Sequence, residues 1–132
     1  RIWGSPNPKL LEYQGEAWGR DMYSVLQKSQ ITLNRHSIVA DEFANNMRLF
    51  EATGCGAMLL TDAKSNIADF FVPGKEVVVY HNTAELIELV EYYLQHRSEC
   101  AKIAVAGQRR TLRDHTYIVR MRQLIKIIER YL

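Results

Sequence analysis

The chain has 132 residues, of which 47% are hydrophobic and 24% are charged, which suits one compact domain with a real core. Its formal net charge is +2, and its basic residues are balanced by acids along the chain, so the composition does not predict nucleic-acid binding. The apolar runs are short, so we expect neither a membrane span nor, at the start, a secretion signal. Because the chain begins at Arg1 rather than Met, we expect a piece of a longer protein.

The first third of the chain predicts a strand, a helix and a second strand. The opening "RIWG", residues 1–4, is a short apolar piece that can form a strand, and the prolines of "SPNP" end it. Residues 15–29, "GEAWGRDMYSVLQKS", place Met22 and Leu26 at helical spacing. The short, β-branched "ITLN", residues 31–34, predicts a buried strand, and a loop of mixed polarity follows it.

The middle of the chain predicts a helix that leads into a strand covered on both faces. Asn45 or Asn46 can cap this helix, and Gly54 is placed to end it in the left-handed conformation. The strand is "AMLLT", residues 57–61, a continuous apolar run that is typical of a buried parallel strand. On the inner side of the helix we expect Met47, Leu49 and Phe50.

The second half of the chain predicts a short helix, a strand and three longer helices. "SNIADFF" forms the short helix, "PGK" a turn and "EVVVY" another covered strand. A capping box from Asn82 to Glu85 begins the next helix, and two further helices finish the chain. Two apolar stripes follow the helical period: Leu86, Leu89, Val90, Tyr93 and Leu94 in the first, and Ile118, Met121, Leu124, Ile125 and Ile128 in the last.

Short strands that alternate with helices predict an α/β fold, here a parallel-sheet, Rossmann-like domain with helices on both faces. Such sheets bind ligands at the carboxyl ends of their strands, where loops lead into helix N-termini. The sequence shows about four strands, where five or six are usual in a doubly wound domain. We therefore expect the missing part before Arg1.

The loop after "ITLN" is the candidate site, because it leads to the helix that starts near Asn45. The free N–H groups and dipole of a helix start favour an anion such as phosphate, and Asn45, Asn46 and Arg48 add donors and charge. Glu51 would lie about 7–9 Å further along the helix axis, where a carboxylate can accept hydrogen bonds from sugar hydroxyls. This order suits a nucleotide, with its diphosphate at the helix start and its ribose beside Glu51.

Other interpretations of these residues stay open. Arg48 and Glu51 are three residues apart, so a simple surface ion pair is an alternative role for them. Asn45 can likewise be a helix cap without binding any ligand. The glycine-rich motifs of classical dinucleotide folds and P-loop enzymes are missing, as is the serine elbow of esterases. Cys55, Cys100 and the histidines have no metal-ligand spacing, so we expect two reduced, buried thiols and no structural metal.

An ordered series of motifs covers nearly the whole chain. It runs through "YQGEAWGRDMYSVLQKSQITLNRH", "NMRLFEATGCGAMLLTD", "FFVPGKEVVVYHNTAELIELVEYYL" and "IAVAGQRRTLRDHTYIVRMRQLI". In this order the motifs resemble the carboxyl half of two-domain (GT-B) glycosyltransferases. The nearest likeness is to the spore-maturation, CgeB-like group, in which a helix with Arg, Phe and Glu leads through a Cys-Gly turn to a strand.

The resemblance implies a cytoplasmic enzyme that moves a sugar from a nucleotide-sugar donor to an acceptor, with no essential metal and no further cofactor. The carboxyl half is the donor-binding half, so the acceptor would be met by an N-terminal domain that this chain lacks. We therefore expect this chain alone to bind donor weakly and to turn nothing over. Glu51 matches the acid that holds the ribose hydroxyls in related retaining enzymes.

The resemblance also places residues outside the Asn45 helix. Related retaining enzymes usually carry a second Glu eight positions before the ribose acid, and here Phe43 stands there, beside Glu42. His36 can face the donor sugar or simply lie in solvent, and Gly15 and Glu16 resemble a loop that borders the donor pocket. In "DHTY", Asp114 or Thr116 can cap the last helix, while His115 is expected to pack or cap, remote from the Asn45 loop.

Two alternatives to a donor-binding domain remain. The first is a non-catalytic module that keeps the fold as a scaffold or interaction partner, which Phe43 in place of the usual acid favours. The second is a stand-alone nucleotide-binding or sugar-phosphate-processing α/β enzyme. The sequence assigns no catalytic residue in any of these cases.

Overall fold

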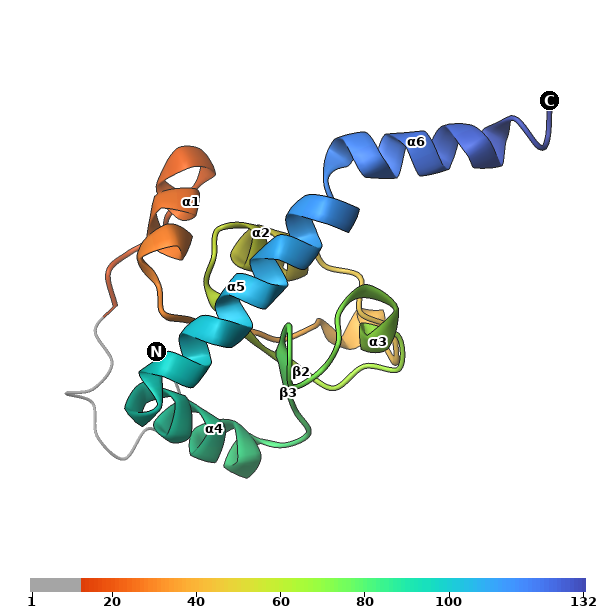
Figure 1. The fold of residues 1–132 in the computed structure, drawn as a ribbon. Coiled ribbons are helices and arrows are strands. Elements are labelled where there is room, and N and C mark those ends of the chain that lie inside the picture. The colour runs from red at the N-terminus through yellow and green to blue at the C-terminus, as the bar shows by residue number, and fades with distance from the viewer. Residues whose placement is uncertain (1–12) are drawn as a thin grey trace.

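The computed structural model describes residues 13–132, which form an α/β domain (Figure 1). Within them lies a three-stranded parallel sheet of order β1-β2-β3, made of β1 (Ile31–Asn34), β2 (Met58–Asp62) and β3 (Val78–Tyr80). The predicted fold class is confirmed. The strand expected at residues 1–4 falls outside the described part of the chain.

Every helix that the sequence predicts is present, and the candidate loop contains an extra 3₁₀ turn. This turn lies between β1 and the second helix. The helical elements are α1 (Gly19–Lys28), the 3₁₀ turn η2 (Ile38–Ala40), α2 (Arg48–Gly54), α3 (Ile67–Phe70), α4 (Thr83–Gln95), α5 (Arg97–Asp114) and α6 (Tyr117–Ile128).

Helices cover both faces of the sheet, as predicted. On one face, Leu59 and Val77 pack with Leu26 of α1, Leu49 of α2 and Phe71. This layer also receives Ile67 of α3, and it forms the base on which α2 lies. Leu26 of α1 and Leu49 of α2 therefore point inward, because the sheet offers them a continuous buried surface.

The opposite face of the sheet is covered by α4 and α5. Met58 and Leu60 of β2 pack there with Cys100 and Ile103 of α5 and with Leu89 of α4. Since β2 carries core side chains on both faces, its continuous apolar run is explained. The prediction that Cys100 is a buried thiol is confirmed.

The strand β1 lies at one edge of the described sheet, which limits its burial. Leu33 is paired with Leu60, and Leu60 with Val78, so the three side chains line up across the sheet. Leu33 is nevertheless 55% exposed, because α4 and α5 pack over β2 and β3. The expectation of a buried strand is therefore wrong for this residue.

The start of α4 confirms the predicted capping box, with one change of partner. Asn82 Oδ1 accepts a hydrogen bond from the Glu85 N–H, at 3.0 Å. The Glu85 carboxylate reaches back to the backbone N–H of His81, at 2.7 Å, instead of that of Asn82. The predicted stripe packs on the sheet except at Leu94, which is 51% exposed.

The start of α2 differs from the prediction. The helix begins at Arg48, Met47 takes the N-cap position, and no side chain caps it. Asn46 instead donates its amide to Asn34 Oδ1, at 3.0 Å. Neither Asn45 nor Asn46 is therefore the cap, because the end of β1 offers Asn46 a better-placed acceptor. Met47 is 57% exposed, so its predicted inward position is also wrong.

The left-handed turn after α2 lies two residues later than the sequence suggests. Gly54 is still helical, and Cys55 keeps a right-handed conformation with φ of −76°. The left-handed residue is Gly56, with φ of 86°, and it turns the chain into β2. The assignment of the left-handed turn to Gly54 is wrong, because Gly54 is the last helical residue of α2 and Gly56 makes the turn.

The second half of α5 fixes α2 in place. Thr111 and Thr53 share a hydrogen bond between buried hydroxyls, at 2.7 Å, and Gln108 donates its amide to the Gly54 carbonyl, at 3.1 Å. At Gly107, α5 passes so close to the backbone carbonyl of Glu76 that no side chain fits between them. The helix α5 therefore packs on the sheet face opposite α2 and also binds α2 directly through these hydrogen bonds.

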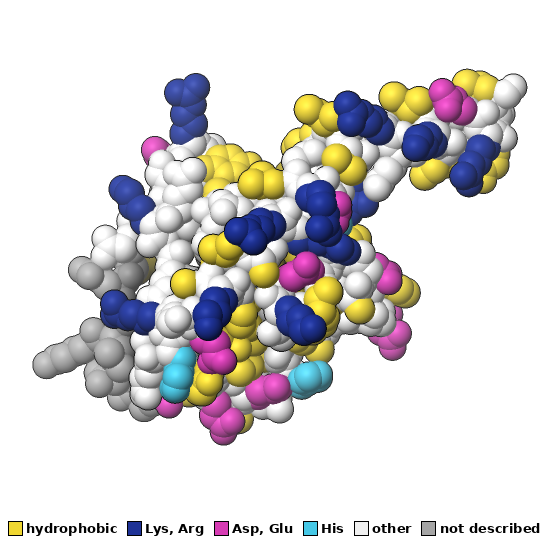
Figure 2. Space-filling model, in the orientation of Figure 1, with side chains coloured by type: hydrophobic (Ala, Val, Ile, Leu, Met, Phe, Trp, Pro, Cys, Tyr) yellow, Lys and Arg dark blue, Asp and Glu magenta, His cyan; other side chains and the backbone are white. Residues whose placement is uncertain are grey.

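The last helix, α6, extends away from the rest of the domain (Figures 1 and 2). Thr116 caps it by accepting a hydrogen bond from the Val119 N–H, at 3.4 Å, as one of the two predicted caps. None of its side chains is buried within the described residues. Its apolar stripe is exposed by 45–65%, at Ile118, Met121, Leu124, Ile125 and Ile128.

Candidate functional site

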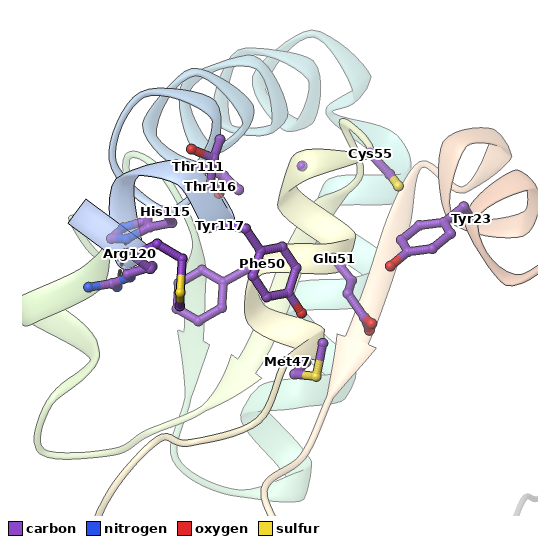
Figure 3. A pocket seen from close by; sticks show the side chains of 12 residues that line it. Tyr23, Met47, Phe50, Glu51, Cys55, Thr111, His115, Thr116, Tyr117 and Arg120 are labelled. Atoms are coloured by element: carbon purple, nitrogen blue, oxygen red, sulfur yellow. Dashed lines mark hydrogen bonds between the residues drawn. The ribbon is translucent and has the colours of Figure 1, made fainter. Parts of the chain in front are cut away.

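A cavity of about 540 Å³ lies along the outer side of α2 (Figure 3). Its volume falls in the range of small-molecule sites, which is roughly 300–1,000 Å³. Three elements supply its walls: α2 in the middle, α1 on one side and the α5–α6 junction on the other. The side chains that determine its chemistry are Tyr23, Phe50, Glu51, Cys55, His115 and Arg120.

Glu51 supplies the carboxylate of the cavity. It projects from the first turn of α2, and its side chain is only 16% exposed. The expected ion pair with Arg48 is present, with Nη1 of Arg48 at 3.6 Å from Oε2 of Glu51. Because a carboxylate offers about four acceptor positions, this one long contact leaves Glu51 free to accept further hydrogen bonds.

Cys55 lines the same cavity and is half-buried, so the prediction of a buried thiol is wrong at this position. Burial raises the pKa of the Cys55 thiol, and the negative charge of Glu51 raises it further. The thiolate is the reactive form of cysteine, so a raised pKa disfavours a nucleophile here. Cys55 therefore contributes an apolar wall to the cavity.

His115 closes the cavity beside α2, where its ring packs among three phenylalanines. Its centroid lies 5.0 Å from that of Phe50, 5.3 Å from that of Phe71 and 6.1 Å from that of Phe70. The prediction that His115 packs is confirmed. Its expected distance from the site is wrong, because α5 runs back along α2 and brings residue 115 to the same cavity as Glu51.

The hydrogen bonds of His115 determine its tautomer. Nε2 lies 2.9 Å from the Phe70 carbonyl oxygen, which can only accept, so Nε2 carries the hydrogen. Nδ1 lies 2.8 Å from a guanidinium nitrogen of Arg120, which can only donate, so Nδ1 is the acceptor. The ring is therefore neutral, and a second proton would face the Arg120 donor directly.

The surroundings of His115 shift its pKa in the same direction. Burial is the main reason that the pKa of His115 lies below its ordinary value, and the hydrogen bond to Phe70 offsets only part of this. The guanidinium charges of Arg120 and Arg110 lower the pKa further, against a smaller effect of Asp114. The folded domain thus favours an uncharged ring in the cavity wall.

We expect the free energy of unfolding to decrease as the pH falls through about 6.5, the ordinary pKa of histidine. Below that pH the unfolded chain binds a proton at residue 115 before the folded chain does, so protonation favours unfolding. Urea unfolding at pH 7.5 and 5.5 measures the difference. A His115→Gln variant should show a smaller difference between the two pH values; an unchanged difference would contradict the neutral ring.

A second group of polar side chains lies at the carboxyl ends of the strands. Asn34 of β1 donates its amide to the Thr61 hydroxyl of β2, at 3.0 Å, and its backbone carbonyl accepts from the Tyr80 hydroxyl of β3, at 2.9 Å. Asn46 joins this group through its bond to Asn34. The entry to α2 is thereby connected to all three strands.

His36 belongs to the same edge of the sheet. Its ring nitrogen Nδ1 lies 2.7 Å from Oδ1 of Asp62, and its backbone N–H donates to the same oxygen, at 2.9 Å. Its side chain has no exposed surface, so the expectation that it simply lies in solvent is wrong. Lys64 lies beside the pair, with Nζ at 3.7 Å from Oδ2 of Asp62.

The charge of Asp62 is favoured at this position. Burial raises the pKa of Asp62, but the hydrogen bonds from the His36 ring and backbone, together with the charges of His36 and Lys64, lower it below its ordinary value overall. Sequence reasoning missed Asp62. The available signal was its position directly after a covered strand, where α/β sheets place polar ligand-binding residues.

The structure separates the residues that the sequence grouped into one site. Among them only Glu51 lines the cavity, while Arg48 pairs with it and Asn46 and His36 belong to the polar group at the strand ends. Asn45 is exposed. Gly15 and Glu16 are exposed before α1 and outside the cavity lining.

Phe43, which stands where related retaining enzymes carry a second Glu, lies on the outside of the candidate loop. Phe43 is 58% exposed, and the neighbouring Glu42 accepts hydrogen bonds through its backbone carbonyl from Ser65. An aromatic side chain in that position is therefore not required by the core of the described domain. Residues 13–132 contain no group of three or more His, Cys, Asp or Glu side chains placed to hold a metal ion.

The parallel sheet, the covering helices and the polar groups at the strand ends define a Rossmann-like α/β domain. Residues 1–126 match the family described as glycosyl transferase-like, so the chain belongs to that family. This confirms the likeness to the GT-B glycosyltransferases. No curated protein matches the chain. None of the helices in the described part of the chain is both long and apolar enough to cross a membrane.

Proposed function

We propose that the chain is the donor-binding domain of a metal-independent glycosyltransferase that takes its sugar from a nucleoside diphosphate sugar. The observation that carries this proposal is the Glu51 carboxylate, which lines a cavity of about 540 Å³ in a member of the glycosyl transferase-like family. The likeness to the CgeB-like group supports the same function. A cytoplasmic location stays a prediction from that likeness.

In this proposal Glu51 binds the ribose. A ribose presents two neighbouring hydroxyl donors, and a carboxylate can accept from both at once. The apolar walls beside Glu51, which include Tyr23 and Phe50, suit the flat, weakly polar surfaces of a nucleoside. The surrounding burial would strengthen these hydrogen bonds relative to those in water.

The diphosphate would lie nearer the start of α2. No side chain caps this helix, and Arg48 in its first turn is 35% exposed, so backbone N–H groups and a positive charge are available there. Asn45 is exposed beside them, with its side chain as a further donor. Such fixed donors would stabilise the negative charge that develops on the leaving diphosphate.

The remaining parts of the enzyme would come from outside this chain. We propose that an N-terminal domain binds the acceptor and that Gly15 and Glu16 border the donor site. A non-catalytic scaffold with the same fold is the second candidate, and the exposed Phe43 in place of an acid is the observation that favours it.

Titration with nucleotides tests the proposal. We would follow backbone amide shifts of the chain while adding UDP, GDP, ADP and their glucose conjugates. Binding at the proposed site should shift amides in residues 34–51 and at Tyr23, which faces the cavity from α1. No response to any of these nucleotides at millimolar concentration, even in a protein that includes the preceding domain, would overturn the proposal.

A further inference from the structure

The exposed face of α6 has the spacing of an interface between two helices. Its apolar side chains recur at alternating intervals of three and four residues, which is the seven-residue pattern of helices that pack in pairs. The central positions of the pattern hold Ile118, Met121, Ile125 and Ile128, with Leu124 beside them. These five side chains are the apolar stripe of α6, and no described element covers them.

Two opposite charges lie along one edge of this stripe. Arg122 and Glu129 are seven residues apart, so they occupy the same position of the pattern, and both are exposed. Glu129 continues the helical register, since its N–H donates to the Ile125 carbonyl, at 2.9 Å. The two residues are separated by about 10 Å along the axis, which is too far for an ion pair within one helix.

A second copy of the helix in the antiparallel direction would neutralise both charges. A two-fold axis through the stripe reverses the second helix and places equal edges against each other. Arg122 of each copy then faces Glu129 of the other copy, which gives two equivalent ion pairs. A parallel pair would instead place this edge against the opposite one, where Tyr117 and Leu124 offer no charge. The charges therefore select the antiparallel pair.

The shape of the chain agrees with this direction. The helix α6 extends away from the rest of the domain, so an antiparallel pair carries its two domains at opposite ends (Figure 1). A parallel pair would bring both domains to the same end. With 12 residues, α6 is about 18 Å long. An interface of this length is small, so we expect a reversible dimer rather than an obligate one.

We propose that α6 is a dimerisation helix, whose apolar stripe packs in the antiparallel direction on the stripe of a second copy, with Arg122–Glu129 ion pairs along the edge. The inference does not depend on the proposed donor-binding function. It does connect to the cavity, because Met121 belongs both to the stripe and to the cavity lining. The end of the second copy's helix therefore lies beside the cavity wall that α6 provides.

Sedimentation equilibrium of the chain and of two charge variants tests the pairing, from micromolar to millimolar concentration at low salt. Arg122→Glu leaves two acids on the edge, and Glu129→Arg leaves two cations. Each variant alone should associate about tenfold more weakly than the wild type, because two attractions become two repulsions. An equimolar mixture of the two should associate as tightly as the wild type, because each acidic edge then meets a basic one.

Two further variants separate the stripe from the rest of the helix. Arg130→Glu is the matched control: it reverses a charge next to Glu129 at a position of the pattern opposite the stripe, so the dimer should persist. Ile125→Glu places a charge in the middle of the stripe and should leave a monomer over the same concentrations. All four variants should fold, since α6 buries no side chain within the described residues. Urea unfolding checks this.

The inference fails if the wild-type chain stays monomeric at every concentration, or if the mixture of Arg122→Glu and Glu129→Arg associates no better than either variant alone. It also fails if a longer protein that includes the preceding domain does not dimerise, since that domain would then cover the stripe. A monomeric chain that binds vesicles containing phosphatidylglycerol, and loses this binding in Ile125→Glu, would assign the stripe to an anionic membrane instead.

Discussion

Replacing Glu51 with alanine is expected to weaken nucleotide binding by at least about tenfold, because a hydrogen bond to a charged group contributes roughly 1.5–3 kcal/mol and about 1.4 kcal/mol is tenfold in affinity. The domain should still fold. The ion pair with Arg48 that this removes is long, at 3.6 Å, and pairs of this spacing stabilise a helix by only about 0.2–0.5 kcal/mol. Amide-shift titration gives the affinity, and urea unfolding gives the stability of the same variant.

A deoxynucleotide makes this test specific for the ribose. The 2′-deoxy form of the best nucleotide should bind the wild-type chain less tightly than the ribonucleotide does. In Glu51→Ala the two nucleotides should bind with the same affinity. Arg48→Ala breaks the same ion pair but leaves the carboxylate in the cavity, so it should keep the preference for the ribonucleotide even though the loss of its charge weakens diphosphate binding. Unchanged affinity in Glu51→Ala would remove Glu51 from the site.

Replacing Gly107 with alanine should destabilise the domain by about 3 kcal/mol, at the upper end of the usual cost of forcing extra atoms into a filled space. A Cβ atom at this position would collide with the backbone carbonyl oxygen of Glu76, which cannot rotate away as a side chain can. Alanine favours a helix over glycine by about 1 kcal/mol, so a net loss shows that the close approach dominates. Urea unfolding measures the change.

The same substitution at Gly54 is the matched control. A Cβ atom there would meet only Thr111 Cγ2, at 3.4 Å, and Gly54 lies within α2. Gly54→Ala should therefore be close to neutral or slightly stabilising. If Gly107→Ala were equally neutral, the close approach of α5 to the Glu76 carbonyl would not require a glycine.

Local patterns predicted most of the fold because their causes lie within a few residues. The continuous apolar run of β2 reflects cover on both faces, and the capping box at Asn82 is closed by a residue three positions away. The apolar stripe of α4 packs on the sheet at the predicted helical period, apart from Leu94 at its end. Each of these signals is complete within one element.

The errors arise where distant residues decide the outcome. Asn46 has the right character for a helix cap, but Asn34 reaches it first from the end of β1. Gly54 stays helical, and its carbonyl accepts a hydrogen bond from Gln108, which is 54 residues later in the chain. The apolar stripe of α6 has the same period as that of α4, yet it stays exposed because no described element covers it.

The candidate site was only partly predictable for the same reason. Glu51 could be found from its own helix, since its spacing from the helix start is local. The pairing of His36 with Asp62 spans 26 positions, and His115 meets Phe50 across 65 positions, so neither contact leaves a spacing signal in the sequence. Contacts of this kind can be predicted only when the order of the strands in the sheet is known.

The arrangement around the α5–α6 junction gives the cavity two walls that differ in how they are packed. The Glu51 wall belongs to α2, which is held from behind by the buried Thr53–Thr111 hydroxyl pair. The opposite wall is carried by Tyr117 and Arg120 of α6, a helix that buries no side chain. Its contacts with the domain include those of Arg120 with His115 and with the Phe50 ring, 5.8 Å away. The volume open to a ligand therefore depends on the direction in which α6 leaves the domain. The position of Glu51 does not depend on α6.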